Sequence, residues 1–71
     1  MYTIRYELPK AANVTIKIFN TLGQEIAVLV NERKDPGSYQ VRWNANVLSG
    51  IYFYRLQAGE FVQTRKAIFL K

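Results

Sequence analysis

Hydrophobic and polar residues alternate along most of the chain, which is the pattern of half-buried β-strands. Apolar side chains occupy every second position over residues 2–8, 14–18 and 39–43, with polar or charged residues between them. Pro9 ends the first run because proline has no N–H to donate to a β-ladder. The alternation therefore predicts strands in these three segments.

The alternation is lost in two further segments. In residues 24–31, Ile26, Val28 and Val30 share one parity while Ala27 and Leu29 share the other. A short helix is one interpretation, although the β-branched content favours a strand. Residues 51–56 are apolar on both parities, as expected of a strand that is covered on both faces or carries exposed tyrosines. Residues 61–70 form a last strand-like segment.

Turn residues separate these segments. Residues 31–37 are charged and end in Asp-Pro-Gly, in which proline presets φ and glycine permits the chain to reverse. This segment, including Gly37, is predicted to be a surface loop. The other predicted turn glycines are Gly23 at a positive φ, Gly50 at the end of an asparagine-rich turn over residues 44–49, and Gly59 in a hairpin turn.

The strand spacing predicts the fold class. Six or seven short strands about ten residues apart, with no convincing long helix, indicate an all-β chain, either an antiparallel β-sandwich or a small barrel, and we favour the sandwich. A chain of 71 residues buries only about 60% of its unfolded surface, so the core is expected to be thin. Trp43 is expected at its centre, as a core anchor. The predicted inward residues are Ile4, Tyr6, Leu8, Val14, Ile16, Ile18, Ile26, Val28, Val41, Trp43, Ile51, Phe53, Leu56 and Ile68.

Composition excludes most enzyme chemistry. The chain has no cysteine and no histidine, so it lacks a thiol nucleophile, a disulfide, an imidazole base and the usual zinc ligands. Its five carboxylates are scattered, and the closest pair, Glu32 and Asp35, lies in the charged turn. We predict no catalytic residue, metal site or cofactor, and we expect that the chain is not an enzyme.

The positive charge raises a different function class. Ten basic and five acidic residues, with 14% aromatic residues, fit a small barrel that binds nucleic acid. However, the basic residues are spread singly over the predicted strands, and no cold-shock or RNP-like motif is present. We therefore expect no nucleic-acid partner. The basic residues in question are Arg5, Lys17, Arg42, Arg55 and Arg65.

The order of motifs along the chain resembles the C-terminal sorting domains of type IX secretion (Por secretion sorting domain, type A). The first half carries IRYELP, ANVTIKIFN and LGQEI, and the second half carries PGSYQVRWN, SGIYFYRL, GEFVQTRK and a final FLK. The resemblance covers residues 3–71, and the ordered set ending in a basic residue is more specific than any single motif. The related immunoglobulin-like domain of flagellar hook-capping proteins usually lacks this terminal strand and lysine.

The resemblance implies a small immunoglobulin-like sandwich that is the address of a secreted cargo protein and is not itself catalytic. Such domains end large secreted proteins of Bacteroidetes-type bacteria. After Sec export, the folded cargo crosses the outer membrane through the type IX translocon, and a sortase-like surface peptidase commonly removes the domain. The implied partners are thus the translocon, the peptidase and a covalently linked N-terminal cargo, and the implied location is the cell surface or the medium. We expect residues 1–71 to be a single domain excised from a larger secreted protein.

Two positions depart from the family pattern. The Asn-Pro segment that often precedes the first strand is missing, so proteolytic processing cannot be predicted from this sequence. Ala67 stands where a larger apolar residue is common in the last strand. The second departure is a conservative loss of volume.

Because a translocon cannot read an active site, it must read shape, backbone or charge. If residues 61–70 lie at a sheet edge, their free N–H and C=O groups can accept a partner strand. We therefore expect recognition at Lys66, Ala67, Ile68, Phe69, Leu70 and Lys71, with Gly50, Ile51 and Tyr52 shaping the adjoining strand. The residues expected to hold the core and turns are Trp43, Phe53, Gly23, Gly37 and Gly59. The lysines could equally protect an edge strand from aggregation.

Two alternatives stay open. The chain could be an immunoglobulin-like accessory module of an extracellular enzyme or adhesin, which spaces domains or binds carbohydrate on Tyr52, Tyr54 and Phe61. It could also form a strand-exchanged homodimer, because exposed edges in a short sandwich invite pairing between chains.

Overall fold

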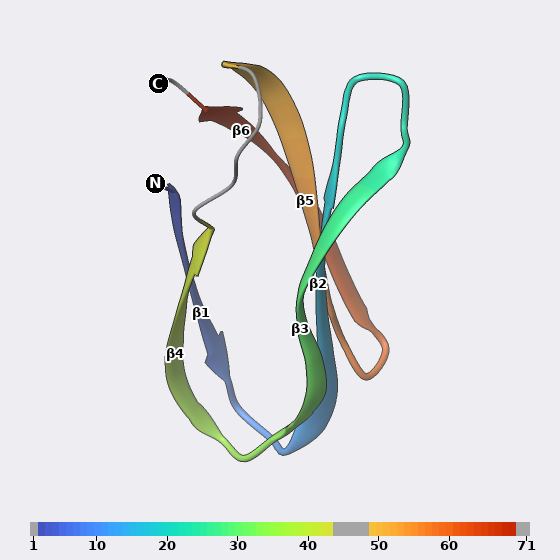
Figure 1. The fold of residues 1–71 in the computed structure, drawn as a ribbon. Helices are drawn as coiled ribbons and strands as arrows, with labels where there is room; N and C mark the ends of the chain where they lie inside the picture. Colours follow the sequence, from blue (N-terminus) through green and yellow to red (C-terminus); the bar gives the residue numbers. More distant parts are fainter. Residues whose placement is uncertain (1, 44–48, 70–71) are drawn as a thin grey trace.

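Six strands form two antiparallel sheets. The structure is a computed structural model that describes residues 2–43 and 49–69. Its strands are β1 (Tyr2–Leu8), β2 (Ala12–Phe19), β3 (Glu25–Lys34), β4 (Gly37–Trp43), β5 (Gly50–Ala58) and β6 (Phe61–Phe69) (Figure 1). One sheet pairs β1 with β4, and the other has the order β3-β2-β5-β6. The predicted fold class, a small antiparallel β-sandwich, is confirmed.

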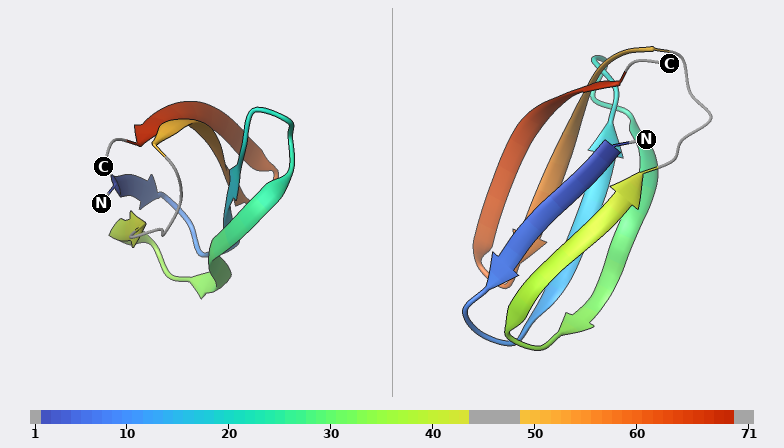
Figure 2. Two further views of the ribbon diagram at one scale, coloured as in Figure 1. Left: turned by 45° about the horizontal axis from the view of Figure 1, so that its top comes forward. Right: turned by 90° about the vertical axis from the view of Figure 1, so that its left-hand side faces the viewer.

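The two sheets lie face to face. Figure 2 shows β1 and β4 crossing the face of the four-stranded sheet. The chain passes between the sheets at one end of the sandwich, through the short links from β1 to β2 and from β3 to β4. The start of β1 and the end of β6 lie together at the opposite end (Figure 1).

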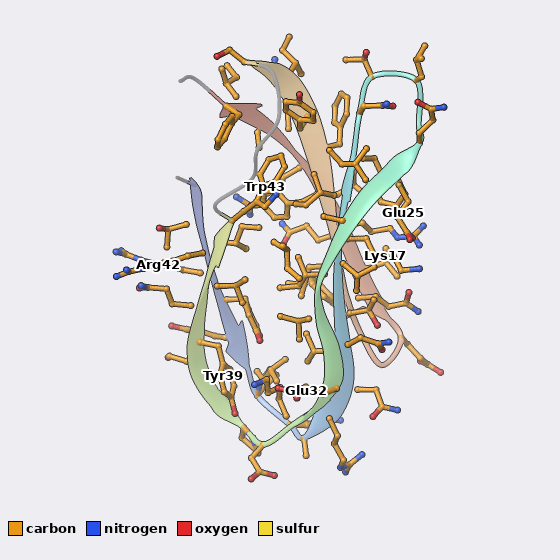
Figure 3. The ribbon with its side chains drawn as sticks, in the orientation of Figure 1. Lys17, Glu25, Glu32, Tyr39, Arg42 and Trp43 are labelled. Atoms are coloured by element: carbon orange, nitrogen blue, oxygen red, sulfur yellow. The ribbon has the colours of Figure 1, made fainter. Side chains whose placement is uncertain are left out.

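The core lies between the sheets and is formed by alternate residues of the strands. Trp43 is only 4% exposed, and its ring contacts the rings of Tyr52 and Phe69 at centroid distances of 5.3 and 5.2 Å. The expectation that Trp43 anchors the core is confirmed (Figure 3). The buried residues are Ile4, Tyr6, Leu8, Val14, Ile16, Ile18, Val30, Trp43, Leu56, Ala67 and Phe69.

Five residues predicted to face inward do not belong to the core. Ile26, Val28, Ile51 and Ile68 are exposed, and Phe53 is half-buried on the outer face of the four-stranded sheet. In β5 the even-numbered residues face the core, with Leu56 buried and Tyr52 and Tyr54 packed against it. Because side chains alternate in a strand, Ile51 and Phe53 must point outward. Val41 is partly buried and packs against the core.

Residues 25–31 lie in strand β3, which has two bulges, so the strand favoured by the β-branched content is confirmed and the helical interpretation was wrong. Val30 lies opposite Ile16, but Val28, not Leu29, lies opposite Lys17. A second shift inserts Ile26 between the partners of Ile18 and Phe19. Each extra residue reverses the alternation, which explains why the apolar residues of this strand have both parities.

The turns follow the sequence signals in part. Gly23 and Gly59 have φ values of 81° and 61°, which are accessible mainly to glycine, so both predicted turn roles are confirmed. Gly37 and Gly50 instead begin strands β4 and β5. The asparagine-rich segment before Gly50 is outside the described residues, apart from Ser49.

Asn20 organises the link between β2 and β3. Its side-chain oxygen accepts hydrogen bonds from the N–H groups of Leu22 and Gln24 at 2.9 and 3.0 Å. Its carbonyl accepts a bond from the N–H of Gly23 at 3.0 Å. This pattern is the local side-chain to backbone bonding that favours asparagine in turns.

Candidate functional site

The two segments expected to take part in recognition lie side by side. The start of β5 pairs with the end of β6, so that Gly50 faces Phe69, Ile51 faces Ile68, Tyr52 faces Ala67 and Phe53 faces Lys66. We call residues 50–53 and 66–69 together the terminal ladder. Leu70 and Lys71, also expected in the site, are outside the described residues.

The inner side of the terminal ladder is fixed to the core. Ala67 and Phe69 are only 1% and 5% exposed. The Phe69 ring is tilted by 45° against Trp43, and Tyr52 meets the same indole edge-on at 80°. Such aromatic contacts add to the stabilisation from burial alone. These three residues therefore hold the ladder in place, and the side chains of Ala67 and Phe69 are covered, while Tyr52 is half-buried.

The outer side of the terminal ladder is available for contact. Ile51 and Ile68 are 45% and 55% exposed and form a cross-strand pair, and Lys66 is also exposed. The half-buried Phe53 lies opposite Lys66. The ladder therefore presents an exposed apolar pair beside a cation.

Neither Arg65 nor Lys66, in the middle of β6, has an acidic partner among the described residues. The ion pairs of residues 2–43 and 49–69 are Lys17 with Glu25, at 3.2 Å, and Lys34 with Glu32 (Figure 3). The Gln63 side-chain amide is assigned with its oxygen toward Arg65, where it accepts bonds from Nη2 and Nε at 2.7 and 2.9 Å. This neutral contact orients the guanidinium and leaves its charge uncompensated.

The last strand lies at a sheet edge, as the backbone argument required. No described strand pairs with the side of β6 that faces away from β5. The pairing with β5 runs from Gly50 and Phe69 to Ala58 and Phe61 without a register shift. This edge is therefore regular and open, in contrast to the bulged strand β3 at the other edge of the sheet.

A comparison with protein families supports the sequence resemblance. The family model described as a secretion system C-terminal sorting domain matches residues 1–70. The chain belongs to this family. No curated protein and no solved structure matches it significantly. The sorting domain is a C-terminal signal for type IX secretion, which leads across the outer membrane to the cell surface or the extracellular space.

Family membership also places the sorting domain in a non-catalytic family that associates with the type IX machinery and an N-terminal cargo. Its described residues include no group of acidic side chains suited to hold a metal ion. Within the same residues, no helix has the length and apolar character needed to cross a membrane.

The three rings considered from the sequence as a carbohydrate platform lie in different surroundings. Tyr52 and Tyr54 pack against the core on the inner face of β5, while Phe61 lies 56% exposed at the other end of β6. Tyr54 and Phe61 line one hollow, whereas Tyr52 packs against Trp43.

A second aromatic cluster lies far from the terminal ladder, between β1, β3 and β4. The rings of Tyr6 and Tyr39 stack at 5.3 Å, and the Lys34 ammonium lies 5.3 Å from the Tyr39 ring centroid. The side-chain hydrogen bond with Glu32 raises the pKa of Lys34. Burial raises the pKa of the Tyr6 phenol, whose hydroxyl finds no hydrogen-bond partner among the described residues. These contacts tie the two sheets of the sorting domain together.

Proposed function

We propose that the terminal ladder, together with Leu70 and Lys71, is the surface by which the type IX translocon recognises the domain. The observation that carries the proposal is the pairing of residues 50–52 with residues 67–69. This pairing joins two motifs distant in sequence into one surface. Lys66, Ile51 and Ile68 supply the exposed contacts, while Tyr52, Ala67 and Phe69 hold them against the core.

The proposal includes the protein to which the domain is attached. Residues 1–71 act as a single domain that follows a cargo protein, which supplies the enzymatic or adhesive activity. A surface peptidase of the sortase type then separates the domain from the cargo. The start of β1 and the end of β6 lie at the same end of the sandwich (Figure 1). The cargo is therefore attached close to the recognition surface.

A fusion assay tests the recognition surface. Residues 2–71, with a Sec signal and a fluorescent protein before them, are expressed in a bacterium that has a type IX system. We expect Lys66→Glu to abolish export. Deleting residues 66–71 is a weaker test, because it also removes Ala67 and Phe69 from the core.

Arg42→Glu is the matched control for charge. Arg42 is exposed and points away from the sandwich on the outer face of the two-stranded sheet (Figure 3). Arg42→Glu changes the net charge of the domain as much as Lys66→Glu does, and we expect normal export of this variant. Equal export of the two variants, both folded by circular dichroism, would refute the proposed surface. Retention of the folded, unmodified domain in the periplasm would instead favour an accessory module.

A further inference from the structure

We infer that the free edge of β6 binds an extended, acidic segment of the secretion machinery, which joins the four-stranded sheet as an additional strand. This inference rests on the proposed function, because it names the chemistry of the partner at the same surface. It follows from the backbone register of β6, from its charges and from the state of the opposite edge.

The register identifies which backbone groups are free. Only Gly59 and Glu60 connect β5 to β6. In a two-residue hairpin the flanking residues, here Ala58 and Phe61, form a hydrogen-bonded pair. The odd-numbered residues of β6 then bond to β5, and the N–H and C=O groups of the even-numbered residues point to the free edge. These residues are Val62, Thr64, Lys66 and Ile68.

The pairing on the other side of β5 supports this assignment. The Gly59 N–H donates to the Asn13 carbonyl at 3.3 Å, so an odd-numbered residue bonds toward β2. In a central strand the bonding direction alternates from residue to residue. The even-numbered residues of β5 therefore bond to β6, as the hairpin requires.

The opposite edge of the sheet is protected. Strand β3 carries an extra residue at Ile26 and another at Leu29. Bulges interrupt the regular spacing of free donors and acceptors and discourage edge-to-edge pairing. Of the two edges of this sheet, β6 alone offers an uninterrupted row.

The side chains beside this row define the partner. Val62 and Ile68, near the two ends, are 53% and 55% exposed. Between them lie Arg65 and Lys66, with no described carboxylate partner. Opposite charges on neighbouring strands stabilise pairing, so the complementary strand is apolar toward its ends and acidic in its centre.

A hollow beside β6 offers a second place of contact for the acidic centre of the added strand. Arg65 belongs to the inner parity of β6, whereas Lys66 belongs to the outer parity. Arg65 and Gln63 line a hollow of about 200 Å³ together with Ile4, Arg5, Tyr6 and Glu7 of β1. Two adjacent acidic residues of an added strand would alternate in direction. One would face Lys66 outside, and the other would lie on the side of Arg65, at the rim of the hollow that Arg5 and Glu7 also line.

The same charges disfavour two of the registers in which a second copy could pair with β6. Opposed residues of antiparallel strands share a face, so the register that pairs all of β6 with its copy places Arg65 opposite Arg65. The next register toward the C-terminus places Lys66 opposite Lys66. Like charges directly opposite each other destabilise a strand pair. The cations therefore disfavour self-pairing in these two registers and attract an acidic strand.

Amide hydrogen exchange of the unmodified chain tests the inference. The probe is a ten-residue peptide of alternating threonine and valine with two central glutamates, and the matched control has two central lysines. We expect the acidic peptide to slow exchange at Val62, Thr64, Lys66 and Ile68 about tenfold or more, and to bind roughly tenfold more tightly than the control. Equal binding of the two peptides, or protection from exchange confined to β3, would overturn the inference. Protection of the four amides that increases with domain concentration in the absence of peptide would also overturn it, because it would indicate self-association.

Export of Thr64 variants separates this inference from the proposed function. Thr64→Pro removes a free-edge N–H but leaves the bonds to β5 intact, whereas Thr64→Val keeps the N–H. We expect loss of export for Thr64→Pro and normal export for Thr64→Val. Export of both variants would refute strand addition while leaving the Lys66→Glu test of the proposed function untouched. If Thr64→Pro does not fold, the peptide measurement alone decides.

Discussion

Adjacent residues of β6 are predicted to differ sharply in their contribution to stability. Phe69 is 5% exposed and packs against Trp43, whereas Ile68 is 55% exposed on the opposite face. Truncating a core phenylalanine to alanine costs about 3–5 kcal/mol, and we expect about 3 kcal/mol for Phe69→Ala because the site is near a strand end. For Ile68→Ala we expect less than about 1 kcal/mol.

The difference is large compared with the stability of so small a domain. At about 0.05–0.15 kcal/mol per residue, a chain of this length has a free energy of unfolding of about 4–11 kcal/mol. Urea denaturation followed by the fluorescence of Trp43, the only tryptophan, measures both variants. Phe69→Ala should lower the transition midpoint at least three times as much as Ile68→Ala. Equal shifts would show that the two faces of β6 are assigned wrongly.

Substitutions at three further positions test local features. Tyr6→Phe should change stability by less than about 1 kcal/mol at neutral pH, because the hydroxyl has no described partner to leave unpaired. Burial raises the pKa of Tyr6 above that of an unfolded tyrosine, so the contribution of its neutral phenol to stability is present below pH about 10 and is lost at higher pH. Urea titrations at a series of pH values should therefore show a smaller alkaline loss of stability for Tyr6→Phe. Gly59→Ala should cost about 1 kcal/mol by thermal denaturation, because its φ of 61° is strained for alanine. Asn20→Ala should cost about 1 kcal/mol, and Asn20→Asp less, because aspartate keeps the acceptor oxygen.

The sequence predicts the strands well where one face is apolar. The first, second and fourth strands alternate cleanly, and their buried residues, such as Ile4, Ile16 and Trp43, follow from a period of two. In β5 both parities are apolar, so periodicity cannot tell which face is covered. That choice depends on the sheet that packs against β5, which is a long-range property.

The sequence named residues for the candidate site but did not predict their geometry. The motif order pointed to Gly50, Ile51 and Lys66, and the structure places them in one ladder. The division into a buried side with Phe69 and an exposed side with Ile68 required knowledge of which face of β6 meets the core. No local signal in the sequence carries that information.

The unequal edges of the four-stranded sheet limit the stoichiometry of any complex made by strand addition. A sheet with two regular edges can grow in both directions and so form a fibre from repeated copies. Here the bulges of β3 disfavour pairing at one edge, so each copy offers one regular edge of this sheet and copies are not linked in series through it. Many copies of such a domain could therefore be crowded together and still engage one partner each, without polymerising.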